Sequence, residues 1–183
     1  MNKFLTDALE LEKQKVPTGK LLEDPYHFWY IGKSYYDSTL GDYPLGMDHI
    51  KEYARRSIFY FGQYINFRHN YNETGRASGV DELGYFAMYA MGDMFKLCGN
   101  YEKALDCGMK AEEFAPSRNE HIVLQAECFK DLSDFDSMKV QTERLMSPDR
   151  KLPFPEYNFL LNMEHYNDSG KYCEQLHQIA NQV

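Results

Sequence analysis

Three groups of four side chains, drawn mostly from aromatic residues, lysines and carboxylates, stand at the same spacing in three segments of the chain. The groups are Tyr26, Trp29, Lys33 and Tyr36; Phe86, Tyr89, Asp93 and Lys96; and Glu120, Val123, Glu127 and Lys130. Aromatic residues with interspersed lysines can anchor an extended peptide, or stack on a sugar while polar neighbours orient it. We therefore predict a non-catalytic module that binds a protein or peptide through an aromatic groove.

The predicted mechanism is burial of a few partner side chains in a preformed groove. Lys33, Lys96 and Lys130 would select acidic or C-terminal carboxylate groups of the partner. Asp93 and Glu127 lie among the lysines that would have to hold the carboxylates of a ligand. The identity of the ligand therefore stays open. The alternative for the aromatic residues is packing between neighbouring helices, and the sequence leaves both readings open for Trp29.

The sequence carries no recognisable catalytic or metal-binding pattern. No two histidines stand at the spacing that holds zinc on one helical face; they are His27, His49, His69, His121, His165 and His177. The triplet Asp134-Phe135-Asp136 fits a D-x-D metal motif by its letters, but it falls in a predicted turn between helices. Glu112-Glu113 fits a solvated helix face. We therefore expect no catalytic residue, no metal and no cofactor in the chain itself.

Length, composition and charge limit the classes of protein to which the chain can belong. The chain has 183 residues, 43% of them hydrophobic, which suits one domain with a sizeable core. Its formal charge of −8 argues against nucleic acid and anionic membranes as partners. Small cysteines at positions that look buried, with no C-x-x-C pair, predict reduced thiols in a cytoplasmic protein: Cys98, Cys107, Cys128 and Cys173. We see neither a signal peptide nor a long apolar run.

The segment from Tyr85 to Pro116 predicts two antiparallel helices joined by a tight turn. Gly92 and Ala104 lie where these helices should cross, because larger side chains there would hold the backbones apart. Gly99 supplies a residue that tolerates positive φ after the first helix, and Asn100 can then cap the second helix. The turn is thus specified by local sequence.

Related helix pairs are expected along most of the chain. We place units at residues 25–68, 81–116, 117–147 and 155–183, with an opening helix at 3–15. Pro25 should open the first unit, whose second helix runs from about residue 45 to 68, and residues 69–79 should form an exposed connection. In the third unit, Ser117 or Asn119 should cap a helix that starts at Arg118, and Ser133-Asp134-Phe135 should replace Gly99-Asn100-Tyr101 as the turn.

These spacings resemble those of tetratricopeptide (TPR) repeats, which recur in a 34-residue frame. The resemblance implies an all-α, right-handed solenoid of about nine helices, made of four helix pairs and the opening helix. In such a superhelix, frame positions two, five, nine and twelve of each unit point into the concave groove. Those positions hold the three groups of aromatic and charged side chains described above.

A narrower resemblance links the chain to the helical region found C-terminal to family 2 type glycosyltransferases of bacteria and viruses. It is carried by the aromatic first helix, by G-N-Y-E-K-A-L, and by a P-x-R-x-E pattern at Pro116, Arg118 and Glu120. The resemblance implies an accessory helical domain that holds the acceptor or docks a glycosyltransferase catalytic domain, and it brings no catalytic residues. A third alternative is a structural protein that self-associates through its solenoid ends as a homo-oligomer.

Overall fold

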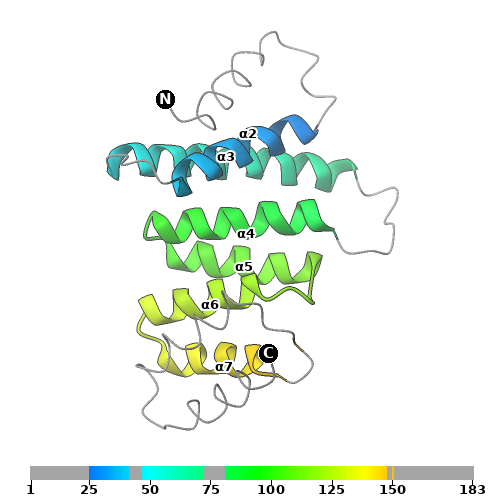
Figure 1. Cartoon of the computed structure of the whole chain (residues 1–183). Coiled ribbons are helices and arrows are strands. Elements are labelled where there is room, and N and C mark those ends of the chain that lie inside the picture. The colour runs from blue at the N-terminus through cyan, green and yellow to red at the C-terminus, as the bar shows by residue number, and fades with distance from the viewer. Residues whose placement is uncertain (1–24, 42–46, 72–80, 148–149, 151–183) are drawn as a thin grey trace.

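The computed structural model describes residues 25–41, 47–71, 81–147 and 150. This part of the chain folds into six helices and contains no strand, so it is all-α (Figure 1). The helices are α2 (Pro25–Leu40), α3 (Met47–Tyr71), α4 (Glu82–Leu97), α5 (Tyr101–Phe114), α6 (Glu120–Asp131) and α7 (Phe135–Leu145). The predicted opening helix at 3–15 and the predicted unit at 155–183 lie outside the described residues.

The helices are stacked in the order of the chain, and successive helices run in alternate directions (Figure 1). Each helix packs against the next one in sequence, from α2 to α7. In addition, α4 contacts both α2 and α6, so these three helices lie next to one another. This arrangement is compatible with a helical repeat fold.

The two tight turns form as the sequence predicts. Gly99 has a φ of +79°, and the side chain of Asn100 accepts a hydrogen bond from the backbone N–H of Lys103 at the start of α5. Ser133 has a φ of 59°, and the side chain of Asp134 accepts from the N–H of Ser137 at the start of α7. Both turns therefore combine a residue in the left-handed region with a side-chain cap.

Some helix boundaries differ from the sequence-based expectation. Helix α3 continues to Tyr71, into the segment expected to be a connection. Helix α6 begins at Glu120 rather than Arg118, because the N–H of Arg118 is held in a turn by the carbonyl of Ala115 at 3.1 Å. Asn119 is the N-cap residue but makes no side-chain cap; its Oδ1 accepts instead from Arg150 at 3.0 Å.

Buried side chains form a core that follows the stack of helices. One cluster joins α2, α3 and α4, another joins α5 and α6, and a third joins α6 and α7. Their buried members include Tyr36, Phe61, Tyr64 and Met94 in the first cluster, Ala104, Leu124 and Cys128 in the second, and Ile122, Met138 and Leu145 in the third. Each helix is thus stabilised by its neighbours in sequence.

Gly92 lies where α4 packs closely against both α5 and α6. A Cβ at this position would lie 2.6 Å from Cδ2 of Leu124, 3.2 Å from the carbonyl oxygen of Ala104 and 3.2 Å from Cβ of Cys107. The predicted crossing at Gly92 and Ala104 is therefore confirmed, and it includes Leu124 of α6 as well.

Gly92→Ala should lower the free energy of unfolding by about 1–3 kcal/mol, because Leu124 and the α5 backbone must move to admit the methyl group. Gly62→Ala is the matched control, because its new methyl group would meet only Met91 Cε at 4.0 Å. The control should gain about 0.5–1 kcal/mol from the better helix propensity of alanine. Denaturant unfolding measures both values, and equal stabilisation by the two substitutions would contradict this packing.

Candidate functional site

The three groups of aromatic and charged side chains lie on the helices that touch one another, α2, α4 and α6. We call these twelve side chains the α2–α4–α6 face; they are Tyr26, Trp29, Lys33, Tyr36, Phe86, Tyr89, Asp93, Lys96, Glu120, Val123, Glu127 and Lys130. Tyr26 is exposed, Tyr36 is buried, and the other ten are half-buried. Since the three helices run in the same direction (Figure 1), the groups form three parallel stripes of partly accessible side chains.

The aromatic part of this face packs between helices. The indole Nε1 of Trp29 donates to the carbonyl of Leu83 at 3.2 Å, and its ring lies 5.5 Å from Phe86 and 6.3 Å from Phe61. Tyr36 meets Phe86 edge to face, with ring centroids 5.6 Å apart. Trp29 therefore joins α2 to α3 and α4, which favours the packing reading of this residue.

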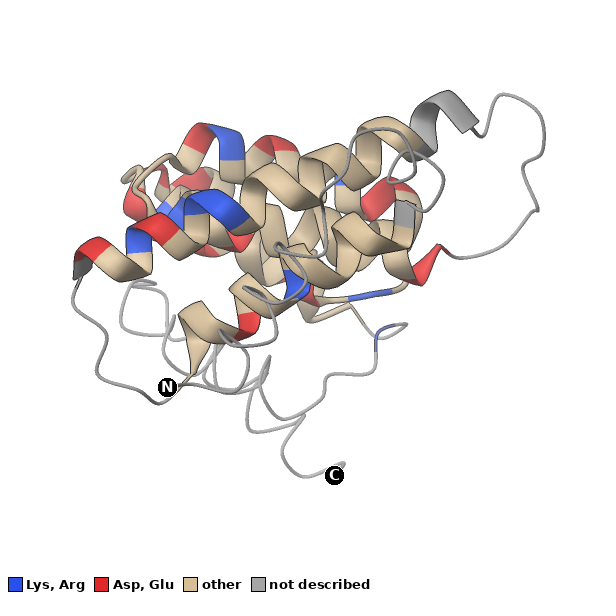
Figure 2. Cartoon of the chain, turned by 90° about the horizontal axis from the view of Figure 1, so that it is seen from above, with Lys and Arg blue, Asp and Glu red and all other residues tan. Residues whose placement is uncertain are grey.

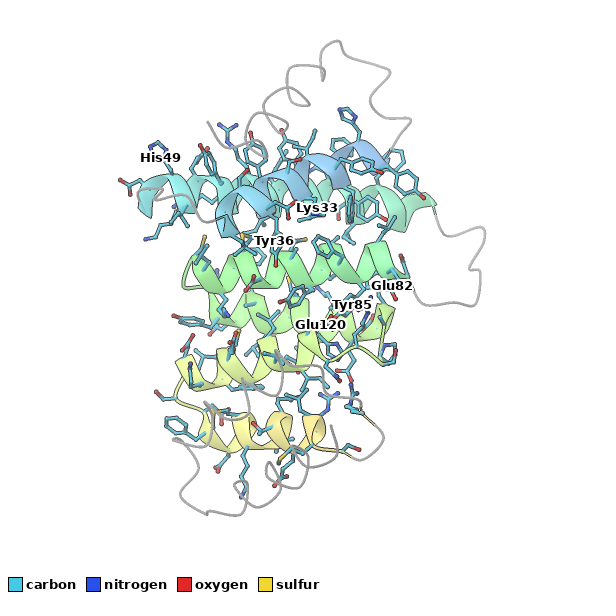
Figure 3. The ribbon with its side chains drawn as sticks, in the orientation of Figure 1. Lys33, Tyr36, His49, Glu82, Tyr85 and Glu120 are labelled. Carbon is cyan, nitrogen blue, oxygen red and sulfur yellow. The ribbon has the colours of Figure 1, made fainter. Side chains whose placement is uncertain are left out.

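The charged part of the face is a chain of contacts from α2 across α4 to α6. The hydroxyl of Tyr36 donates to Asp93 Oδ2 at 3.3 Å. Lys96 Nζ lies 3.6 Å from Asp93 Oδ1 and donates to Glu127 Oε2. Lys33 lies 5.8 Å from the centre of the Phe86 ring, and Lys33 and Tyr36 extend from α2 toward α4 (Figure 3). The structure thus brings together residues from all three stripes.

Burial and neighbouring charges shift the pKa values in this chain of contacts. Burial raises the pKa of Asp93 above its usual value and outweighs the opposing effects of Lys96 and Tyr36. Burial lowers the pKa of Lys96, but the hydrogen bond and charge of Glu127 outweigh it, so the net shift is upward. Burial also raises the pKa of Tyr36, with smaller contributions from Tyr89 and Asp93. The centre of the face therefore places the Lys96 side chain next to those of Asp93 and Glu127.

Each lysine of the face lies close to a carboxylate of the chain itself. Lys33 Nζ is 2.5 Å from Asp37 Oδ2, and Lys130 Nζ is 4.0 Å from Asp131 Oδ1. Asp37 is absent from the set identified in the sequence, although its spacing of four residues from Lys33 was a readable signal. A carboxylate ligand would have to compete with these internal partners.

A second polar cluster lies where α4 and α6 begin (Figure 3). The hydroxyl of Tyr85 donates to Glu120 Oε2 at 3.0 Å, and burial raises the pKa of Tyr85. Arg118 Nη2 is 2.6 Å from Glu82 Oε2, and its Nη1 is 3.4 Å from Glu120 Oε1. Arg150 donates to the carbonyl of Pro116 at 3.2 Å. The P-x-R-x-E segment is thus tied down by internal contacts.

His121 is fully buried beside this cluster. Its Nε2 lies 3.7 Å from Glu112 Oε2, a distance too long for a hydrogen bond, and neither ring nitrogen has a hydrogen-bond partner. Glu112 instead accepts from Arg144. Burial lowers the pKa of His121 to about 4 against the opposing charge of Glu112, so the imidazole is neutral at pH 7.

The described residues offer no group of three or more His, Cys, Asp or Glu side chains placed to bind a metal ion. Asp134 of the D-x-D triplet caps α7, as the turn interpretation requires. Cys98, Cys107 and Cys128 are free thiols, and burial raises the pKa of Cys107 to about 11 and that of Cys128 to about 12. These two thiols are therefore protonated at neutral pH and unreactive.

No protein-family model matches the chain, and no curated protein matches it. The resemblances to TPR repeats and to glycosyltransferase-associated helical regions therefore stay predictions from the sequence. Within the described ranges, no helix has both the length and the apolar composition needed to cross a membrane.

Stability should fall as the pH drops from about 6.5 to about 4, because the unfolded chain binds a proton at His121 that the folded chain resists. This one group should cost about 3 kcal/mol at pH 4. Unfolding curves across this range, with His121→Phe as the comparison, measure the effect. The variant should show a shallower pH dependence, and an unchanged slope would contradict the account.

Asp93→Asn should leave the Tm at pH 7 equal to or above that of the parent chain. Since the folded pKa of Asp93 lies above 3.8, its contribution to stability is present below that pH and is lost as the pH rises through the folded pKa. Asparagine is neutral at every pH, so the variant does not lose this contribution to stability as the pH rises. Asp106→Asn, which breaks an exposed pair with Lys110 at 2.7 Å, serves as control and should cost about 0.3–0.5 kcal/mol. A Tm drop of several degrees for Asp93→Asn alone would refute the burial argument.

Proposed function

We propose that the chain is a non-catalytic binding module, a TPR-like solenoid that recognises a protein segment through the α2–α4–α6 face. The observation that carries the proposal is the partial burial of the side chains on this face. Ten of its twelve side chains are half-buried, and they join three helices while keeping part of their surface accessible. A preformed surface of this kind can bind a partner with little ordering of its own side chains.

The order of helix packing supports a solenoid. Each helix packs on its neighbours in the chain, and the main contacts between alternate helices are between α2 and α4 and between α4 and α6. In a curved stack, the helices on the inner side are the ones that approach one another most closely. This geometry would place the α2–α4–α6 face on the concave side, where repeat proteins of this architecture bind extended partners.

Not every aromatic residue of the face would contact the partner, as the prediction from the sequence assumed. Trp29 contacts α3 and α4 and fixes the position of α2, so it shapes the face rather than contacting the partner. Tyr89, Lys96 and Glu127 are half-buried and lie on α4, the central helix of the three, and on α6, which packs against it. We assign the partner contacts to the middle of the face.

Photo-crosslinking residues placed at Lys33 and at Glu127 should capture the same partner from the native host. The side chains replaced there are 38% and 32% exposed, so a crosslinker at either position reaches the surface of the face. Mass spectrometry of the crosslinked species identifies the partner and the site of attachment.

Crosslinkers at Glu113 of α5 and Lys139 of α7 provide the control, because both side chains are exposed on the other set of helices. They should not capture that partner. Capture from these positions alone, or from none of the four, would refute binding through the α2–α4–α6 face.

A further inference from the structure

We propose that the partner segment carries no charge where it meets the α2–α4–α6 face, and that it binds through apolar and aromatic side chains and a backbone carbonyl. This inference rests on the proposed function and names the chemistry of the partner. It replaces the expectation that the lysines of the face select acidic groups.

The charges of the face cancel. Its twelve side chains include three lysines and three carboxylates; the lysines are Lys33, Lys96 and Lys130, and the carboxylates are Asp93, Glu120 and Glu127. The net charge of −8 of the whole chain therefore arises outside this face. Basic and acidic residues also lie next to one another on the described helices (Figure 2). A charged segment of either sign would meet both signs on the face, so neither sign is favoured.

Each charge of the face already has a partner within the chain. Lys33 lies 2.5 Å from Asp37, and Lys96 donates to Glu127 and lies 3.6 Å from Asp93. The other charged groups of the face contact Tyr85, Arg118 and Asp131; the contacts are Glu120 with Tyr85 and Arg118, and Lys130 with Asp131. A charged group of the partner would exchange one ion pair for another and lose its own hydration, so it would gain little.

The centre of the face favours a neutral hydrogen-bond acceptor. A lysine ammonium has three N–H donors, and Asp93 and Glu127 engage at most two of those on Lys96. A further carboxylate would be repelled by these two acidic groups, and a further cation would be repelled by the ammonium. A backbone carbonyl of the partner can accept from Lys96 without either repulsion.

Exposed apolar side chains lie on α2 beside this charged centre. Tyr26 is 50% exposed. Tyr30 follows it by four residues, lies edge to face with Trp29 at 5.4 Å between ring centroids, and is 57% exposed. Leu40, the last residue of α2, continues the spacing of the stripe and is 52% exposed. Helix α2 therefore offers apolar surface near both of its ends, and burying this surface under apolar side chains of the partner would favour binding.

Selection from a random peptide library displayed on phage, with the immobilised full chain as bait, tests the inference. Enriched peptides should share a core of uncharged residues with apolar or aromatic side chains. A labelled synthetic copy of an enriched peptide is then measured by fluorescence anisotropy. Its dissociation constant should change by less than about twofold when the salt concentration is raised about tenfold. Replacing a core residue of the peptide by lysine or glutamate should weaken binding by about tenfold or more.

The double variant Tyr30→Ser/Leu40→Ser should weaken binding of the same peptide by about tenfold or more, because it removes exposed apolar surface from α2. Phe59→Ser/Met109→Ser is the matched control. It removes side chains that are 57% and 54% exposed on α3 and α5, and it should leave binding unchanged. Circular dichroism checks that each variant is folded.

The contrary results separate this inference from the proposed function. Enrichment of acidic or basic peptides, or binding that weakens strongly as salt is added, would overturn the inference. Equal losses in the two double variants, no loss in the first of them, or enrichment of no peptide would overturn it as well. The proposed function would survive any of these results if the crosslinkers at Lys33 and Glu127 still captured a partner, and it would fail if they did not.

Discussion

The missing side chain at Gly92 sets the spacing of α4, α5 and α6. Leu124 of α6 occupies the space that a Cβ at residue 92 would need, and the α5 backbone at Ala104 closes the same space from the other side. Because α4 is held against both neighbours, the stripe that begins at Phe86 lies beside the stripe that begins at Glu120. The contact of Lys96 with Glu127 depends on this approach.

The α2–α4–α6 face is built at some cost in stability. Burial disfavours the ionised form of Asp93 and raises its pKa, and a neutral side chain of the same shape would avoid that cost. Proteins tolerate such conflicts mainly where a site needs them. The buried, unpartnered His121 presents a similar conflict at the start of α6. The two differ in accessibility, because His121 is fully buried whereas the side chain of Asp93 is 20% exposed.

The sequence predicts the features that depend on local chemistry. Gly99 and Asn100 define one turn and Asp134 caps the helix after another, because positive φ and side-chain caps act within a few residues. Small size at Gly92 and Ala104 predicts the helix crossing. The residues of the candidate face come from the repeat frame that the sequence resembles, whose chosen positions are three and four residues apart and therefore share one side of each helix.

The features that the sequence does not settle depend on long-range contacts. The environment of Trp29 is set by Leu83, Phe61 and Phe86, which come from two other helices. The side chain of Asn119 is drawn away from its cap by Arg150, which is 31 residues distant. The sequence also shows lysines as available charges, while the fold pairs Lys96 with Asp93 and Glu127 of the chain itself.

The most direct test of this account is a solution NOESY spectrum of the chain, with Gly92 and the leucine methyl groups assigned. The account predicts strong cross-peaks between a Leu124 methyl group and the Hα protons of Gly92, which join α6 to α4 at their closest point. Absence of these cross-peaks, with Leu124 instead contacting residues outside α4 and α5, would contradict the packing that aligns the α2–α4–α6 face.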